Sequence, residues 1–250
     1  GSVAAAIKCF QYFYQLKNKA KQNIVATNNS WGGAIQSEAL RDAMAGPDQP
    51  IHICAAGNSN TSVPHNPAAF DLPNIISVAA TDHNDKYASF SNYGADWVDL
   101  AAPGVDILST VPKGSCPLCN PSGYDTVSGT SMATPHVTGA VALLYAQYPK
   151  LSTDQIKQRL LAAIDPLADR SKQTATNGRL NLFNSLENDP TPPAAVSDLT
   201  AAGVLLTKVN LVWTAPGDDG AKGRANAYDL RYSTSPITEA NWDTATQAEG

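Results

Sequence analysis

The sequence predicts an α/β fold with a mostly parallel sheet, followed by a proline-rich linker and a smaller piece of β-structure. Residues 1–189 alternate between segments with apolar residues at helical spacing and short apolar runs typical of buried strands. Such alternation favours a parallel sheet with helices on both faces. Residues 190–195 are rich in proline, which favours extended chain. Beyond them apolar and polar residues alternate as in half-buried strands.

The predicted helices begin and end at recognisable signals. The first covers the opening residues, and a short helix over 37–45 ends at Gly46-Pro47. A longer helix is predicted from about Ser131 to Tyr148. The segment Ser152-Thr153-Asp154-Gln155 has the pattern of a capping box, which starts a helix that reaches about Ile164. Apolar runs between the helices predict strands over 24–27, 51–56, 74–80, 98–101 and 105–111.

Composition narrows the classes of function. The formal net charge is −5 and no basic stripe is present, which argues against a nucleic-acid partner. No apolar run reaches the ~20 residues needed to span a bilayer. A length of 250 residues allows one large domain or two.

The most informative segment is Val127-Ser128-Gly129-Thr130-Ser131-Met132-Ala133-Thr134-Pro135-His136. Gly129 allows a tight turn. Ser131 is then predicted at the start of a helix, where unpaired N–H groups and the positive end of the helix dipole face any anion. An oxyanion formed when Ser131 attacks a carbonyl would meet these donors. The alternative is an ordinary helix cap rich in serine and threonine.

This segment resembles the nucleophile motif G-T-S-M-A-[ST]-P-H of the subtilisin-like serine proteases. The resemblance extends over residues 1 to about 189. It implies the C-terminal portion of a three-layer subtilisin-like peptidase domain with a mostly parallel sheet, in which Ser131 is the catalytic nucleophile of a serine endopeptidase. It also implies a polypeptide substrate and a secreted or cell-surface location.

Two further segments resemble parts of the same family's site. In Ile51-His52-Ile53-Cys54-Ala55-Ala56-Gly57-Asn58, the resemblance assigns the oxyanion-binding side-chain amide to Asn58. The alternative for Asn58 is a turn residue in the left-handed region. In Asn28-Asn29-Ser30-Trp31-Gly32-Gly33 the family pairs a backbone edge with the extended substrate, although an ordinary turn with Trp31 in the core is the alternative. The substrate-binding residues implied by resemblance are Ser30, Trp31, Gly32, Ala56, Gly57 and His65, the last near the floor of the specificity pocket.

A serine nucleophile needs a base that a third group orients. The family motifs D-[ST]-G and H-G-T-H, which provide the Asp and His, do not occur in these residues. We expect both upstream, so the N-terminal half of the domain is needed and the 250-residue chain alone is predicted to be inactive. Three of the histidines present are interpreted as a packing residue (His136), a core or sheet-face residue (His52) and a loop residue (His83). The alternative is a pseudoprotease or non-catalytic binding module.

The C-terminal part, 196–250, resembles the first half of a fibronectin type III module, with Trp213 as its core tryptophan. A complete sandwich of this type needs about 100 residues, so the module is predicted to be partial. It follows the linker at 190–195 and the peptidase domain over 1–189.

Cysteines and metals leave alternatives open. Cys116-Pro117-Leu118-Cys119 can mean a disulfide, half a zinc site or a redox pair. A local disulfide is favoured, and Cys9 and Cys54 are interpreted as buried thiols. No cofactor is required and no metal ligand is assigned. By loose family overlay, Asp82 and the backbone of 68–70 form a structural calcium site that is not expected to be occupied.

Overall fold

The computed structural model describes residues 2–34, 36–46, 49–187, 196–204, 209–214, 230–238 and 241–247. The chain divides into two compact units, Gly1–Asn188 and Asp189–Gly250. Each unit is described by itself. The linker predicted at 190–195 lies outside the described residues.

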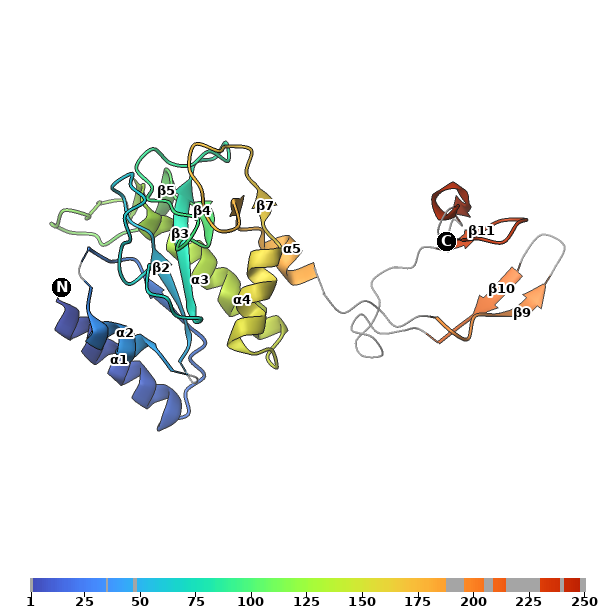
Figure 1. Cartoon of the computed structure of the whole chain (residues 1–250), viewed down its shortest axis with the longest axis horizontal. Coiled ribbons are helices and arrows are strands. Elements are labelled where there is room, and N and C mark those ends of the chain that lie inside the picture. The colour runs from blue at the N-terminus through green and yellow to red at the C-terminus, as the bar shows by residue number, and fades with distance from the viewer. Residues whose placement is uncertain are drawn as a thin grey trace. The chain divides into compact units, whose positions relative to one another are not determined.

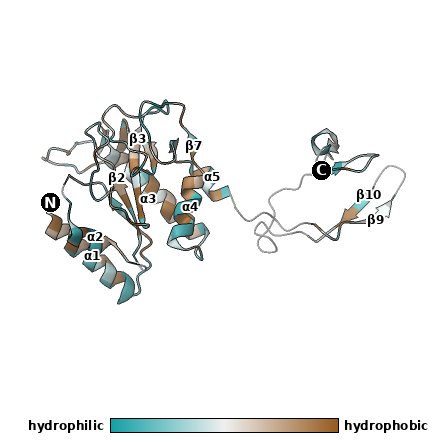
Figure 2. Ribbon diagram, viewed as in Figure 1, coloured by the Kyte–Doolittle hydropathy of each residue, from teal (hydrophilic) through white to brown (hydrophobic). Residues whose placement is uncertain are grey.

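A central sheet organises the first unit, and it is mostly parallel, as predicted (Figure 1). Its strand order is β1-β2-β3-β4-β8-β7, and only the pairing of β7 with β8 is antiparallel. Every residue of β2 and β3 is buried, and these strands are apolar in Figure 2, as expected for strands covered on both faces. The strands are β1 (Ala26–Asn29), β2 (Ile51–Ala55), β3 (Ile75–Thr81), β4 (Leu100–Pro103), β7 (Asp165–Pro166) and β8 (Gly178–Arg179).

Helices cover both faces of this sheet (Figure 1). Side chains of α3 (Thr130–Gln147) and α4 (Thr153–Ala162) pack in one core cluster with Ile53, Val78 and other strand residues. Side chains of α1 (Val3–Asn18) and α2 (Glu38–Met44) pack in a second cluster with Cys54 and Ile75. Because neighbouring residues of β2 belong to different clusters, the unit has three layers, with α5 (Leu182–Glu187) following β8.

Local signals explain where several helices begin. Ser152 accepts a hydrogen bond from the backbone N–H of Gln155, and the side chain of Gln155 accepts one from the N–H of Ser152, so the predicted capping box is confirmed. Ser37 caps α2 by accepting a hydrogen bond from the N–H of Leu40, without the reciprocal half of a capping box.

One predicted strand lies outside the central sheet. The apolar run over 105–111 forms β5 (Ile107–Thr110), which pairs antiparallel with β6 (Tyr124–Val127) in a separate ribbon. Three of the four residues of β5 are exposed. β6 leads directly into Ser128 and Gly129, so this ribbon connects to the start of α3.

The second unit consists of short antiparallel ribbons in its described part. β9 (Thr200–Val204) pairs with β10 (Val209–Val212), and β11 (Arg231–Tyr232) pairs with β12 (Thr246–Gln247). A 3-10 turn covers Trp242–Thr244, and Trp213 is half-buried. The fibronectin-like arrangement stays a prediction, and residues 215–229 of it lie outside the described part.

None of the helices within the described ranges combines the length and apolar character that a bilayer crossing requires.

Candidate active site

The predicted site residues come from three segments that meet at the carboxyl ends of the sheet's strands. Ser30 follows β1, Asn58 follows β2, and Ser131 lies in the first turn of α3. The hydroxyl of Ser30 donates to the carbonyl of Ser131 at 2.8 Å, and the hydroxyl of Ser131 donates to the carbonyl of Ser30 at 3.3 Å. The carboxyl ends of parallel strands are the usual place for a binding site in such a sheet.

Pro135 explains why the carbonyl of Ser131 can accept this bond. In a regular helix the N–H of residue i+4 donates to the carbonyl of residue i. Proline has no N–H, and Pro135 stands four residues after Ser131 inside α3. The Ser131 carbonyl is therefore left for the hydroxyl of Ser30, which ties the loop after β1 to the start of α3.

The side chain of Asn58 is held in one orientation by Thr130. Its Oδ1 accepts from the backbone N–H of Thr130 at 2.9 Å and from the Thr130 hydroxyl at 2.8 Å. A backbone N–H can only donate, so the atom that faces it must be the oxygen. The Nδ2 of Asn58 therefore points away from Thr130, and it lies 3.4 Å from the position that a Cβ on Gly129 would take. The alternative interpretation, a left-handed turn residue, is wrong, because the positive φ values in this loop belong to Gly57 and Asn60.

Gly57 sets the conformation of this loop. Its φ is +103°, which disfavours any side chain, and a Cβ there would lie 2.5 Å from Nδ2 of Asn92. Its N–H donates to the hydroxyl of Thr130 at 3.1 Å. The preceding Ala56 is fully buried and donates to the carbonyl of Val78 at 3.0 Å. Thr130 thus holds both the backbone and the side chain of this loop.

His65, in the long loop between β2 and β3, packs against the backbone at Gly32 and Gly57. Gly33 and Asn66 exchange backbone hydrogen bonds of 2.9 and 2.8 Å, which fixes the two segments against each other. A Cβ at Gly32 would lie 2.6 Å from Nε2 of His65, and one at Gly57 would lie 3.2 Å from its ring. The side chain is half-buried, and burial lowers the pKa of His65, so the imidazole is neutral at neutral pH.

Trp31 lies on the same loop as Ser30 and Gly32, but it is not part of the core. Its side chain is 40% exposed, and its ring centroid is 6.4 Å from that of Phe10. The structure thus brings Ser30, Gly32, Ala56, Gly57, Asn58, His65 and Ser131 to one edge of the sheet. Trp31 is on the same loop and faces solvent in part.

In the described part of the chain, no histidine is hydrogen-bonded to the hydroxyl of Ser131, which donates to the carbonyl of Ser30. His52 is fully buried between the hydroxyl of Thr27 and the carbonyl of Met44, and burial lowers its pKa to about 4. The core interpretation of His52 is therefore confirmed.

The other two histidines are exposed. His83 lies in a loop, as predicted, next to Asn84. The interpretation of His136 as a packing residue is wrong. Its side chain is exposed, and its Nδ1 is 2.9 Å from the carbonyl of Met132, one turn back along α3.

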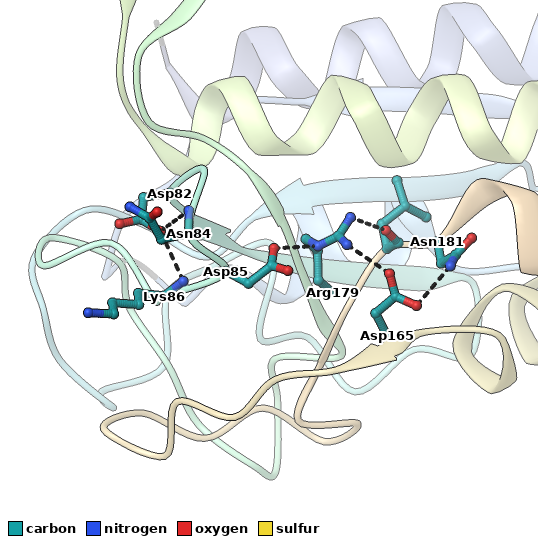
Figure 3. Close-up of polar contacts among 8 residues, drawn as sticks. Asp82, Asn84, Asp85, Lys86, Asp165, Arg179 and Asn181 are labelled. Carbon is teal, nitrogen blue, oxygen red and sulfur yellow. Dashed lines mark hydrogen bonds and ion pairs between the residues drawn. The ribbon is translucent and has the colours of Figure 1, made fainter.

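The predicted calcium ligands do not come together. The carboxylate of Asp82 accepts from the backbone N–H groups of Asn84 and Lys86, each at 2.9 Å, and so caps its own turn (Figure 3). These bonds, that from Lys86 first, lower the pKa of Asp82. In the same view Arg179 pairs with the neighbouring Asp85 and with Asp165, each at 2.7 Å. The acidic groups around this turn are therefore already partnered.

The segment 68–70 lines a different hollow, of about 200 Å³. The described residues around it include Asp99 and Lys157 but not Asp82. The ammonium of Lys157 lies 3.3 Å from the Asp99 carboxylate and donates to the carbonyl of Ile75. The ammonium of Lys157 therefore already pairs with the Asp99 carboxylate, and Asp82 does not line this hollow, so the predicted ligand set does not form a calcium site. Within the described ranges no group of three or more His, Cys, Asp or Glu residues could hold a metal ion.

The cysteines differ in their surroundings. Cys116 and Cys119 form a disulfide in the loop between β5 and β6, so the favoured interpretation is confirmed over the zinc and redox alternatives. Cys54 is buried, as predicted, and burial raises the pKa of its thiol. Cys9 is exposed, so its interpretation as a buried thiol is wrong.

Sequence reasoning assigned no separate role to Thr130, Asn92 and Lys172. Thr130 belongs to the motif around Ser131, but only the structure shows that it orients Asn58. Asn92 and Lys172 are buried polar side chains that contact the backbone around this site. A buried lysine or asparagine is unusual, but the sequence alone gives no sign that either is buried.

The fold and the site define a three-layer α/β protein with a serine at a helix start beside an oriented carboxamide. The sequence model of the subtilase family matches residues 3–185, so the chain belongs to this family. It is 38% identical over 173 residues to thermitase of Thermoactinomyces vulgaris, which covers 67% of this chain and 56% of thermitase. It is 40% identical over 148 residues to subtilisin DY of Bacillus licheniformis, which covers 57% of this chain and 50% of that protein.

Solved structures agree with this assignment. A cold adapted subtilisin-like serine proteinase matches with a TM-score of 0.61 and 32% identity, over 73% of this chain and 62% of that chain. The chain spans about half the length of the two curated relatives it matches.

Proposed function

We propose that the chain is the part of a serine endopeptidase that carries the nucleophile, Ser131, and the oxyanion-binding residue, Asn58. The observation that favours this most is the orientation of Asn58. Thr130 fixes its oxygen, so its NH2 group is free to donate towards the start of α3. A neutral amide donor suits this role because it does not titrate.

In this proposal Ser131 Oγ attacks the carbonyl carbon of the scissile peptide bond. Its proton passes to a histidine that lies outside these residues. The Nδ2 of Asn58 and the backbone N–H of Ser131 stabilise the oxyanion. The histidine then returns the proton to the leaving amine as the C–N bond breaks, and water hydrolyses the acyl-enzyme, which restores the Ser131 hydroxyl.

The base and the group that orients it are proposed to come from an upstream half of the domain with the Asp and the His. Two observations support this. The Ser131 hydroxyl donates to a backbone carbonyl, and no such contact activates a nucleophile. In addition, β1 is the outer strand of the described sheet, and beside it lies an open hollow of about 400 Å³ between β1 and α1.

The substrate is proposed to be an extended polypeptide that lies between the backbone of 30–32 and that of 56–57. His65, which contacts both segments, would form part of the pocket for the side chain before the scissile bond. The location is proposed to be secreted or at the cell surface, where a disulfide such as that of Cys116 and Cys119 persists. Residues 196–250 are proposed to be a partial fibronectin type III-like domain after a linker at 190–195.

Labelling with a fluorophosphonate probe tests the proposal in the full-length natural protein. We expect labelling that Ser131→Ala abolishes. Ser128→Ala is the matched control, since Ser128 is an exposed serine three residues away whose hydroxyl contacts Asp106. Undiminished labelling of Ser131→Ala would show that Ser131 is not the nucleophile. Measurable peptide hydrolysis by residues 1–250 alone would contradict the proposal that the base lies outside them.

The second candidate is a non-catalytic binding module. The hydrogen bond from the Ser131 hydroxyl to the Ser30 carbonyl favours this candidate, because a serine that donates to a carbonyl is not paired with a base. Such a protein would bind extended peptides at the same two backbone segments and would not react with the probe. The labelling of the unaltered full-length protein therefore separates the two candidates.

A further inference from the structure

Lys172 is a buried lysine whose ammonium is surrounded by backbone carbonyls. Its side chain is only 8% exposed. The Nζ donates to the carbonyls of Ala88, Ser89 and Ser91 at 2.6, 2.9 and 2.9 Å. An ammonium has three N–H donors and no acceptor, so three carbonyls match it completely. Burial lowers the pKa of Lys172, whereas the charge of Asp169 raises it.

The residue after this carbonyl cluster, Asn92, holds the loop of Asn58. Asn92 is 1% exposed. Its Nδ2 donates to the carbonyl of Ala56 and its backbone N–H to that of Gly57, each at 2.9 Å. Its Oδ1 accepts from the N–H of Ser59 at 2.9 Å. These bonds fix the backbone on both sides of Asn58.

Asn58 therefore has two anchors that come from different parts of the chain. Thr130 holds its side chain, and Asn92 holds its backbone neighbours. The position of Asn92 depends in turn on the segment 88–91, whose carbonyls converge on Lys172. If the ammonium were replaced by an apolar group, the carbonyls of Ser89 and Ser91 would lose this donor, whereas that of Ala88 would keep the backbone N–H of Ser91. The segment would have to shift to give the two carbonyls new donors.

We propose that Lys172 is a positioning residue for oxyanion binding, because its ammonium holds the segment that places Asn92 and, through Asn92, Asn58. The inference rests on the proposed function, which assigns the oxyanion role to Asn58. Lys172 touches neither substrate nor the reacting atoms. It acts through two backbone segments, and a displacement of about 1 Å at a catalytic donor is enough to lower a rate by roughly 10²-fold.

A double-mutant cycle in the full-length natural protein tests this. We expect Lys172→Met to lower kcat by roughly 10- to 100-fold with little change in KM. Asn58→Ala removes the donor itself, and for this family a loss of roughly 10²–10³ is a known magnitude. In the Asn58→Ala background, Lys172→Met should then lower kcat by less than about 2-fold, since the donor that it positions is gone. Multiplying losses, or an unchanged kcat in Lys172→Met, would overturn the inference.

Lys157→Met is the matched control. Lys157 is a partly buried lysine that, like Lys172, donates to a backbone carbonyl, that of Ile75, and its other partner is Asp99 rather than 88–92 or the loop of Asn58. This variant should lose stability and keep its kcat. If Lys172→Met does not fold, Lys172→Gln retains two N–H donors and is expected to show a smaller loss of kcat with the same non-additivity.

Hydrogen exchange gives a readout that does not depend on catalysis. The N–H groups of Ser59 and Thr61 both donate to Oδ1 of Asn92. They should exchange faster in Lys172→Met than in the unaltered protein, and not in Lys157→Met. Unchanged exchange in both variants would refute the positioning role. If the unaltered protein reacts with no probe and hydrolyses no peptide, the proposed function is wrong. The exchange result would still show whether Lys172 holds the loop of Asn58 through Asn92.

Discussion

Replacing Thr130 with valine should separate the anchor of Asn58 from the rest of the helix start. Thr130 is fully buried, and its hydroxyl accepts from Gly57 and donates to Asn58. Valine has nearly the same shape but no hydroxyl. The Gly57 N–H would be left without its acceptor, at a cost of about 1–3 kcal/mol, and Asn58 would lose one of two bonds, worth about 1 kcal/mol. We expect a loss of about 2–4 kcal/mol in the free energy of unfolding.

Thr134→Val is the control for this substitution. Thr134 is also fully buried in α3, but its hydroxyl donates to the carbonyl of Thr130, which accepts a helical N–H as well. Its removal leaves no orphaned donor and should cost under about 1 kcal/mol. Urea unfolding of the full-length natural protein and the two variants measures both losses. Equal losses would refute the view that the Thr130 hydroxyl holds the loop of Asn58.

Three further predictions concern other buried groups. The pKa of His52 is about 4 in the folded protein, against an ordinary 6.5. Keeping His52 neutral therefore contributes about 3 kcal/mol to the free energy of unfolding above pH 6.5, and this contribution is lost as the pH falls through about 4. Urea unfolding at several pH values should show that the free energy of unfolding falls less steeply in acid for His52→Gln than for the unaltered protein. Lys157→Met should lose about 1–2 kcal/mol at neutral pH, because Asp99 loses its cation, and this deficit should shrink in acid as Asp99 protonates; an equal deficit at pH 7 and pH 4 would contradict the pairing. A maleimide should label Cys9 in the native protein and the disulfide cysteines after reduction, but Cys54 only after unfolding, as read by mass spectrometry.

The layered unit could be predicted because its strongest signals are local. The strands over 51–56 and 74–80 are continuous apolar runs, and the observed β2 and β3 match them within one residue at each end. The start of α4 follows from the capping box at Ser152. The first strand begins two residues later than predicted, at Ala26, and includes Asn28 and Asn29. Asn29 is buried with its amide bonded to Thr27, a tertiary arrangement that hydrophobic periodicity does not report.

Exposure was harder to predict than secondary structure. Cys9 and His136 lie on helices where predicted, yet both face solvent. The spacing of residues shows which side chains share a helix face, but not how far the neighbouring layer extends over that face. The ligand set overlaid for calcium, which was not expected to be occupied, also depended on tertiary placement that the sequence does not show. It joined Asp82 to 68–70 by overlay, whereas the hollow at 68–70 does not include Asp82, and its Asp99 is paired with Lys157, a residue far along the chain.

At the site, the sequence motif identifies the candidate residues but not the orientation of their side chains. The sequence identifies Ser131 and Asn58 as candidates because each stands in a recognisable pattern, but a pattern does not orient a side chain. Orientation comes from Thr130, which fixes the oxygen of Asn58, and from Pro135, whose missing N–H leaves the Ser131 carbonyl to Ser30. Both residues belong to the same motif as Ser131, so the motif specifies the contacts that join three loops as well as the nucleophile. Lys172 belongs to no such pattern, because a cation that binds backbone carbonyls imposes no sequence on the segment that it holds.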